Sequence, residues 1–246
     1  NRTNWRPGFP EPDLAALRAY VNYRAGTLTP EGPVDRGQRI LAWNNCLRCH
    51  PREGAPGLGA YAVSITKLLP ELNGSVPTLV PPSLNGVGDK LRDEVLLKSV
   101  AGEFPAVRLP WLKVRMPRFS HSAEDRQALA RYLTDHDRLE SPPAEWVAAP
   151  PVPDASQRSA ALVVGHTLLG SQGFSCIACH QFGKFQPRNT ALGTRGSDLQ
   201  NIGSRLRREY FLRWSRSPIR IVPDMEMPGY ERPFPGLPGG QIQRQL

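Results

Sequence analysis

The sequence predicts a mainly α-helical protein in which two similar modules follow one another, with long loops rich in proline and glycine. Several segments carry apolar residues at helical spacing, whereas strand-like alternation of useful length is absent. The 26 prolines and 22 glycines favour loops and turns between these segments. The same order of features occurs twice, in residues 31–140 and in residues 157–246. A length of 246 residues suits about two small domains.

The first module, residues 31–140, is expected to begin with a short amphipathic helix at 35–44. The apolar side of this helix carries Ile40, Leu41 and Trp43. The helix leads directly into the first of two cysteine pairs, so its packing would position that pair.

The rest of the first module is expected to consist of a loop and two helices. Pro82 and Gly86 stand in a Pro/Gly-rich stretch that is typical of loop. A helix is predicted at 93–100. A closing helix is predicted to begin after Ser122, whose side chain can cap it, and to run through Leu133.

The second module repeats this plan with one difference. A helix at 157–169 precedes the second cysteine pair, a Gly-rich loop follows, and a helix at 207–216 comes next. The closing helix is reduced to a stub that starts near Gly240. The proline density of residues 141–156 predicts an extended, semi-rigid linker between the modules.

Residues 1–30 are expected to form an N-terminal helical extension, with apolar residues at helical spacing in 12–24. This segment looks like a closing helix without a module of its own. Together with the short C-terminal helix, it favours a native polypeptide or an assembly that continues further; a frayed tail is the alternative. The first residues lack the apolar core of a signal peptide, and no run approaches the roughly 18 apolar residues of a membrane span.

All cysteines of the chain belong to two copies of the pentapeptide Cys-x-x-Cys-His. The copies are Cys46-Leu47-Arg48-Cys49-His50 and Cys176-Ile177-Ala178-Cys179-His180, and they use all 4 cysteines. This is the attachment signature of c-type haem, in which two thiols add to the haem vinyl groups and the adjacent histidine binds iron. We therefore expect two covalently attached haems c.

Three other uses of cysteine pairs fit less well. A structural zinc site would need the four sulfurs to converge and does not require the following histidines. A disulfide framework is expected in short, cysteine-dense secreted chains. A thioredoxin-like redox pair would follow a strand in a βαβ pattern, which neither copy does.

The order of helix, Cys-x-x-Cys-His, Pro/Gly loop, helix, Met-Pro and closing helix resembles class I cytochrome c, and it does so twice. The resemblance covers about residues 31–140 and 157–246 and implies two tandem cytochrome c-like helical domains. It also implies Met116 and Met227, each followed by proline, as the second axial iron ligands. A thioether is a soft ligand that raises the potential. Met225 competes with Met227, and the proline after Met227 favours the latter.

In this family a proline carbonyl in the loop accepts a hydrogen bond from the iron-binding imidazole. The resemblance places Pro82 in that position, and it places Ser197 there in the second module, where a backbone carbonyl is retained. His121 is an alternative ligand close to Met116. His136 is expected to be solvated and His166 to serve packing, and the aromatic residues are expected in the core or in haem-pocket walls. These aromatic residues are Trp43, Trp111, Tyr132, Phe174 and Trp214.

The net charge of +9 is unevenly placed. Residues 157–246 hold 12 Lys and Arg against 5 Asp and Glu, a balance of +7, while residues 31–140 hold 15 against 13. A solvated surface that balances haem propionates is one interpretation, and a docking face for an acidic redox partner is the other. The docking face would use the arginines around the helix at 207–216, which are Arg205, Arg207, Arg208, Arg213, Arg216 and Arg220. Nucleic-acid binding is disfavoured because no aromatic-basic platform is present.

These features predict a dihaem electron-transfer protein rather than an enzyme. Its location would be periplasmic or otherwise extracytoplasmic, because haem is normally attached to this pentapeptide outside the cytoplasmic membrane. One alternative is a haem-bearing subunit of a larger membrane-associated oxidoreductase, which differs in partners and not in chemistry. A dihaem peroxidase is disfavoured because it needs a displaceable sixth iron position, whereas both modules carry a Met-Pro.

Overall fold

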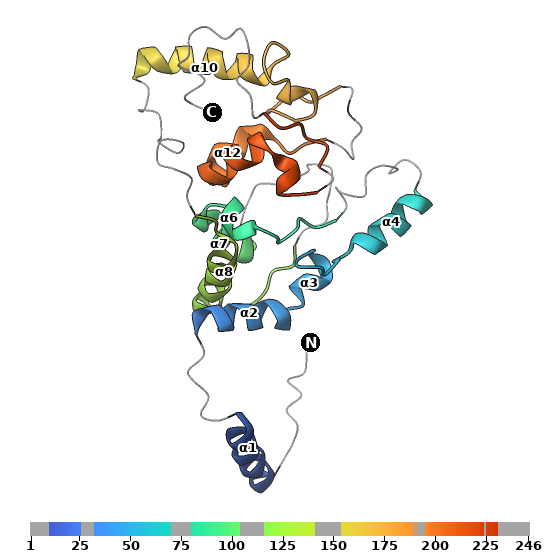
Figure 1. Ribbon diagram of the computed structural model, residues 1–246, viewed down its shortest axis with the longest axis vertical. Helices are drawn as coiled ribbons and strands as arrows, with labels where there is room; N and C mark the ends of the chain where they lie inside the picture. Colours follow the sequence, from blue (N-terminus) through green and yellow to red (C-terminus); the bar gives the residue numbers. More distant parts are fainter. Residues whose placement is uncertain are drawn as a thin grey trace.

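The computed structural model describes residues 10–25, 32–69, 80–103, 116–140, 154–188, 190, 195–223 and 225–230 (Figure 1). Within these ranges the chain is mainly helical, and extended pairing is limited to isolated bridges. The predicted mainly α class is therefore confirmed. None of the helices in these ranges combines the length and apolar character that crossing a membrane requires.

The first module is built on the contact between α2 (Pro33–Trp43) and α8 (Ala123–Asp137), which pack against each other (Figure 1). Gly37 permits this contact, because a Cβ atom there would lie 2.2 Å from the carbonyl oxygen of Ala128. The expected cap of α8 is confirmed, since Ser122 Oγ accepts a hydrogen bond from a backbone N–H of the first turn at 3.1 Å.

Two further helices, α6 (Val87–Lys90) and α7 (Asp93–Val100), complete the core of the first module against α8. Gly88 brings α6 close, because a Cβ atom there would lie 2.1 Å from the Leu133 carbonyl oxygen. The buried cluster joins α2, α6, α7 and α8. Its members are Ile40, Leu41, Val87, Leu91, Val95, Leu96, Val100, Ala128, Leu129, Ala130, Tyr132 and Leu133.

The second module consists of short helices connected by loops. In order they are α10 (Ala155–Leu169), the 3₁₀ helices η2 (Cys176–Ala178) and η3 (Leu199–Asn201), α11 (Ile202–Arg205), α12 (Arg208–Arg216) and the 3₁₀ helix η4 (Pro218–Arg220). α12 buries Tyr210 and Leu212. The helices predicted at 93–100 and 207–216 are thus present within one residue at each end.

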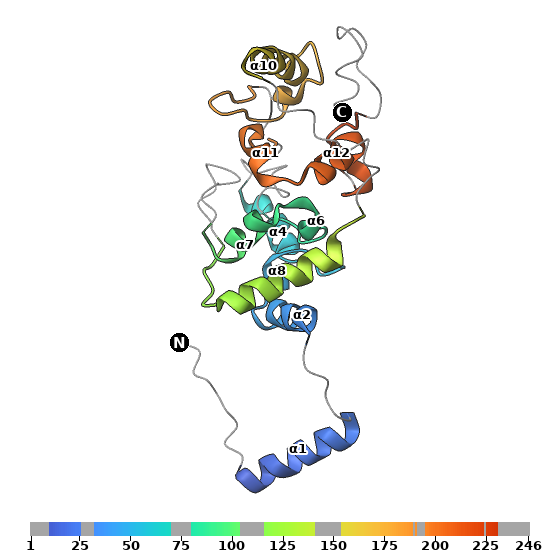
Figure 2. The same cartoon turned by 90° about the vertical axis from the view of Figure 1, so that its left-hand side faces the viewer.

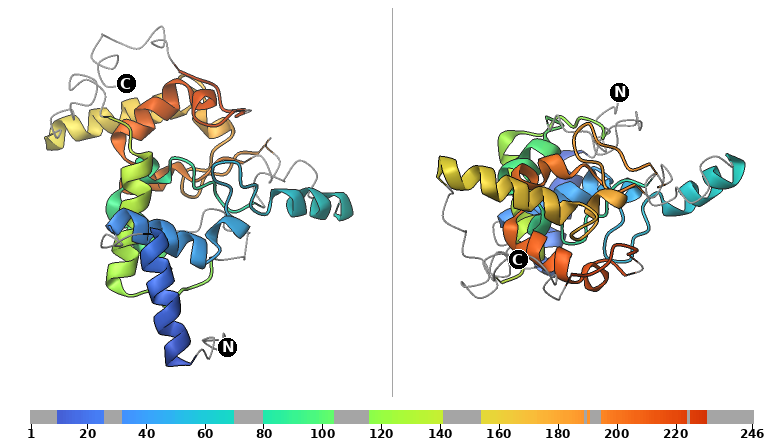
Figure 3. Two further views of the ribbon diagram at one scale, coloured as in Figure 1. Left: turned by 60° about the horizontal axis from the view of Figure 1, so that its bottom comes forward. Right: turned by 90° about the horizontal axis from the view of Figure 1, so that it is seen from above.

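Three details differ from the sequence expectations. The segment after the first pentapeptide contains α4 (Gly59–Leu68), a helix that extends away from the other helices (Figure 3) and not a continuous loop. Trp43 lies on the surface, 68% exposed, because the buried side of α2 is formed by Ile40 and Leu41. Residues 155–156, predicted as linker, belong to α10.

The remaining expectations concern α1 and segments outside the described residues. α1 (Glu11–Ala25) is helical as predicted and is drawn apart from the other helices (Figures 1 and 2). Residues 141–153 of the predicted linker, Trp111 and the stub near Gly240 lie outside the described residues.

The two modules share the backbone conformation of one turn, which the sequence alone did not reveal. Leu91, between α6 and α7, has φ −92° and ψ 150°, and Leu206, between α11 and α12, has φ −94° and ψ 149°. The following residues, Arg92 and Arg207, have φ −64° and ψ 145° and φ −69° and ψ 140°. The repeated plan that the sequence predicts therefore extends to the torsion angles of this turn.

Candidate haem attachment sites

The first pentapeptide forms a single helical turn, α3 (Cys46–Cys49), at the end of α2. Asn45 adopts a left-handed conformation, with φ 54°, and so redirects the chain between the two helices. Cys46 is half-buried against the core, and Cys49 is exposed. The turn is closed by the His50 N–H, which donates to the Cys46 carbonyl at 2.9 Å.

The imidazole of His50 is oriented by the loop that carries Pro82. Nδ1 of His50 lies 2.6 Å from the Pro82 carbonyl oxygen, and the same loop is held by the Leu84 N–H donating to the Pro51 carbonyl at 2.9 Å. A carbonyl oxygen only accepts hydrogen bonds, so Nδ1 carries a proton, and in the neutral ring Nε2 then keeps its lone pair. The ring is therefore in the tautomer that can bind a metal through Nε2.

The second pentapeptide reproduces this arrangement with different residues. Ser175, at φ 56°, takes the left-handed conformation, and the His180 N–H donates to the Cys176 carbonyl at 2.9 Å. His180 Nδ1 lies 2.9 Å from the Ser197 carbonyl oxygen. The serine at the position of Pro82 thus provides the same acceptor, because the acceptor belongs to the backbone.

Gly196 makes room for the His180 ring. A Cβ atom at position 196 would lie 2.3 Å from both Nδ1 and Cε1 of the imidazole. Real Cβ atoms do not approach other atoms so closely, so any larger residue would displace either the ring or the loop. The sequence placed Gly196 in a Gly-rich loop but gave no sign of its contact with the His180 ring.

The segments after the pentapeptides also match. Leu84 N–H donates to the Pro51 carbonyl and Leu199 N–H to the Gln181 carbonyl, both at 2.9 Å. A small antiparallel bridge follows each histidine, between Arg52 and Ala55 in one module and between Phe182 and Phe185 in the other. Two sites with this much shared backbone geometry indicate one local design used twice.

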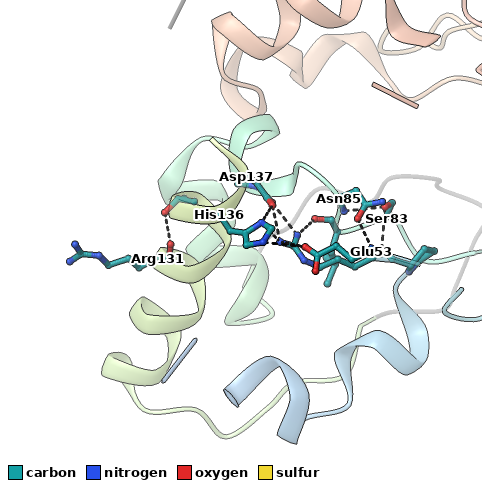
Figure 4. A network of polar contacts seen from close by, with 11 residues as sticks. Glu53, Ser83, Asn85, Arg131, His136 and Asp137 are labelled. Carbon is teal, nitrogen blue, oxygen red and sulfur yellow. Dashed lines mark hydrogen bonds and ion pairs between the residues drawn. The ribbon is translucent and has the colours of Figure 1, made fainter. Parts of the chain in front are cut away.

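A network of polar contacts joins Glu53, which follows the first pentapeptide closely, to Asn85 and to His136 and Asp137 at the end of α8 (Figure 4). The Arg52 side chain is 1% exposed and donates to the carboxylate of Asp137 at 2.8 and 3.2 Å and to the Leu84 carbonyl at 2.6 Å. Hydrogen bonding to Asp137 raises the pKa of Arg52, although burial acts in the opposite direction and is the largest single effect. His136 is 49% exposed, in agreement with the predicted solvation, and its Nδ1 lies 3.0 Å from Arg52 at the edge of this network.

The four cysteines are free thiols in the described structure, so no disulfide joins them within or between the modules. Burial raises the pKa of Cys46 and of Cys176, so both favour the neutral thiol. Within the described ranges no three His, Cys, Asp or Glu side chains come together as a metal-ion site would require, and the cysteine pairs do not converge as zinc would need. Two free thiols beside one oriented imidazole in each module fit covalently attached haem.

The methionines differ in their surroundings. Met116 is 43% exposed at the start of the segment that leads to α8. Met227 is half-buried, and its sulfur accepts a hydrogen bond from Trp214 Nε1 at 3.1 Å. Met225 is also half-buried. Trp214 therefore gives the Met227 thioether a defined place beside α12.

A pocket of about 320 Å³ lies beside the second pentapeptide. Ile177 and Ala178 of the pentapeptide line it together with Phe185 and Pro187, and Arg188 contributes a guanidinium group. The wall of this pocket combines these apolar side chains with the hydroxyl groups of Ser171 and Ser175 and the guanidinium group of Arg188.

The remaining predicted histidines do not join these sites. The ring of His121 stacks on Phe119 with centroids 5.4 Å apart, and both of its nitrogens are buried without a hydrogen-bond partner. His166 packs edge-on against Phe182, with centroids 6.0 Å apart, which agrees with the predicted packing role.

The arginines near α12 are not all available for docking. Arg207 and Arg213 form ion pairs with Asp89 of the first module and are only 14% and 22% exposed. Burial lowers the pKa of Arg205. The cluster predicted as one docking face is therefore partly used inside the molecule.

No family model, no curated protein and no solved structure matches this chain.

Proposed function

We propose that the chain is a dihaem c-type cytochrome that passes single electrons between redox partner proteins and makes no covalent change to a substrate. The observation that carries this proposal is the repeated geometry of the two pentapeptides. In each one, a single turn presents two free thiols, and the histidine contacts a backbone carbonyl through Nδ1. Haem iron, when bound, supplies the one-electron chemistry.

Each module would hold one haem with its own residues. The first uses Cys46, Cys49, His50 and Met116, and the second uses Cys176, Cys179, His180 and Met227. The cysteines provide covalent attachment, and the carbonyls of Pro82 and Ser197 fix the imidazoles and raise their basicity. Met227 is favoured over Met225 because Trp214 holds its sulfur in place. Arg188, which lines the pocket beside the second pentapeptide, suits a propionate.

Haem retention after denaturation tests the proposal. The purified protein should keep haem-linked peroxidase staining on a denaturing gel, and acid-acetone extraction should leave the colour in the precipitate. Replacing Cys46 and Cys49 by serine should halve the haem per chain, and replacing Cys176 and Cys179 should remove the other half. Haem that passes quantitatively into the acid-acetone phase would contradict covalent attachment.

The same chemistry inside a larger membrane-associated oxidoreductase is the second candidate. Its support is three large apolar side chains on α1, Leu17, Tyr20 and Tyr23, which are 45%, 62% and 85% exposed. Exposed apolar side chains three residues apart on one helix favour contact with another protein. Purification under mild conditions would show a stoichiometric partner in this case, and a Leu17→Glu change would release it. Either role places the protein outside the cytoplasmic membrane.

A further inference from the structure

The two modules contact each other through equivalent residues. Leu91 and Leu206, which occupy the same place in the repeated turn, form an antiparallel bridge. The Arg92 N–H donates to the Arg205 carbonyl at 3.1 Å, and the Arg207 N–H donates to the Lys90 carbonyl at 3.0 Å. Each module therefore contributes one donor and one acceptor, as in an interface related by a local two-fold axis.

In the ion pairs at this contact, the first module supplies the carboxylate and the second module supplies both guanidinium groups. The Asp89 side chain is 4% exposed, and its two carboxylate oxygens accept hydrogen bonds from Arg207 at 2.7 Å and from Arg213 at 2.5 Å. Ser204 stands at the equivalent place in the second module. Because a buried carboxylate is stable only when it is paired, Asp89 favours the joined arrangement of the modules.

Apolar and aromatic contacts extend the same surface. Leu206 packs against the core of the first module. Lys90 Nζ lies over the rings of Tyr210 and Trp214, 5.8 and 5.9 Å from their centroids, which is within the range of cation–π attraction. Main-chain pairing, a buried ion triad and apolar packing thus coincide at a single place.

On both sides of this contact, the contacting elements also hold residues of the candidate haem sites. α6, which carries Asp89, directly follows the loop whose Pro82 carbonyl orients His50. On the other side, Trp214 of α12 donates to the sulfur of Met227. A displacement of one module relative to the other would therefore act on groups that surround both sites.

We propose that residues 89–92 and 205–214 form a clasp that holds the two modules as one rigid unit, with Asp89 as its positioning residue. The contacts of the clasp are all made by protein groups. Its consequence, a fixed geometry between two haems, rests on the proposed function. A fixed separation would give the electron transfer between the two haems a single distance.

Hydrogen exchange in the full-length protein tests the clasp directly, because the Arg92 and Arg207 amides are its two main-chain donors. Both amides should be protected in the native protein. Replacing Asp89→Asn should speed their exchange by at least about tenfold, since it leaves two buried guanidinium groups without their counter-charge. The matched control is Asp93→Asn, which removes a carboxylate that pairs with Arg138 inside the first module.

Amides of α8 serve as the internal standard for folding, because they report the core of the first module. If Asp89→Asn lowers their protection as well, Arg213→Gln, which removes one arm of the triad from the other side, replaces it in the test. Equal protection of Arg92 and Arg207 in the Asp89→Asn and Asp93→Asn proteins would overturn the clasp, as would free exchange in the native protein. Amide exchange and haem content are separate readouts of the same purified full-length protein, so failure of the clasp and failure of the proposed function are separate results.

Discussion

The imidazoles of His50 and His180 illustrate how the backbone prepares a side chain for one role. Each ring donates from Nδ1 to a carbonyl, at 2.6 and 2.9 Å, and so presents Nε2 with its lone pair. The acceptor is a proline carbonyl in one module and a serine carbonyl in the other. The tolerance for Ser197 follows from this, because the side chain at that position takes no part in the bond.

Gly196 gives a steric prediction at the residue scale. Gly196→Ala would bring a Cβ to 2.3 Å from the His180 ring and should destabilise the second module by about 1–3 kcal/mol. Gly203→Ala is the matched control, because a Cβ there meets nothing within 4 Å. Thermal unfolding and haem content of the second site should separate the two variants. Equal behaviour would show that the ring does not need this space.

The proposed methionine ligands, Met116 and Met227, give a spectroscopic prediction. The ferric protein should show the weak near-infrared band of sulfur-to-iron charge transfer from both sites. Met227→Leu should remove one site's share and lower that haem's potential, because a thioether favours ferrous iron. Met225→Leu should leave the band intact. The opposite pattern would assign the ligand to Met225.

At the scale of elements, the helices were the part most accessible from sequence. Residues 93–100 carry apolar periodicity, residues 122–133 add a capping signal at Ser122, and both segments fold into helices. α4 was missed because nearby prolines and glycines suggested a continuous loop, although its own interior has neither residue. The exposure of Trp43 could not be predicted, because periodicity does not show where the partner helix ends.

The contact between α2 and α8 gives a pH prediction. A hydrogen bond from Arg36, at 2.5 Å, lowers the pKa of the Asp125 carboxyl. A depressed folded-state pKa contributes stability that is present above the unfolded value of about 3.9 and is lost as the pH falls through the folded value. Asp125→Asn should therefore lower stability at neutral pH and weaken its decline in acid. The pair is partly exposed, so the effect should be below about 1 kcal/mol.

Urea unfolding at several pH values measures this contribution. Asp135→Asn is the control, because Asp135 pairs with Arg131 on the exposed face of the same helix and does not link two helices. If both variants show the same pH dependence, the Arg36 contact adds nothing specific.

At the scale of the whole molecule, the sequence showed two modules and their motifs but not how the modules meet. Asp89 and Arg213 are 124 positions apart, and no local pattern connects them. From the sequence, the arginines near α12 could either dock a redox partner or balance haem propionates. Arg207 and Arg213 are buried against Asp89, so they add little to a surface that could dock a partner. Charge reversal at Arg220 should therefore change the salt dependence of electron transfer, and Arg207 and Arg213 should not act as docking residues.

The central claim is that each pentapeptide carries a covalently attached haem, and the mass of the intact denatured chain tests it most directly. The account predicts a mass above the 27.2 kDa polypeptide by two haems, reduced to one haem when Cys46 and Cys49 or Cys176 and Cys179 are replaced by serine. A denatured chain with the mass of the polypeptide alone, from cells that attach haem to other proteins of this class, would contradict the account.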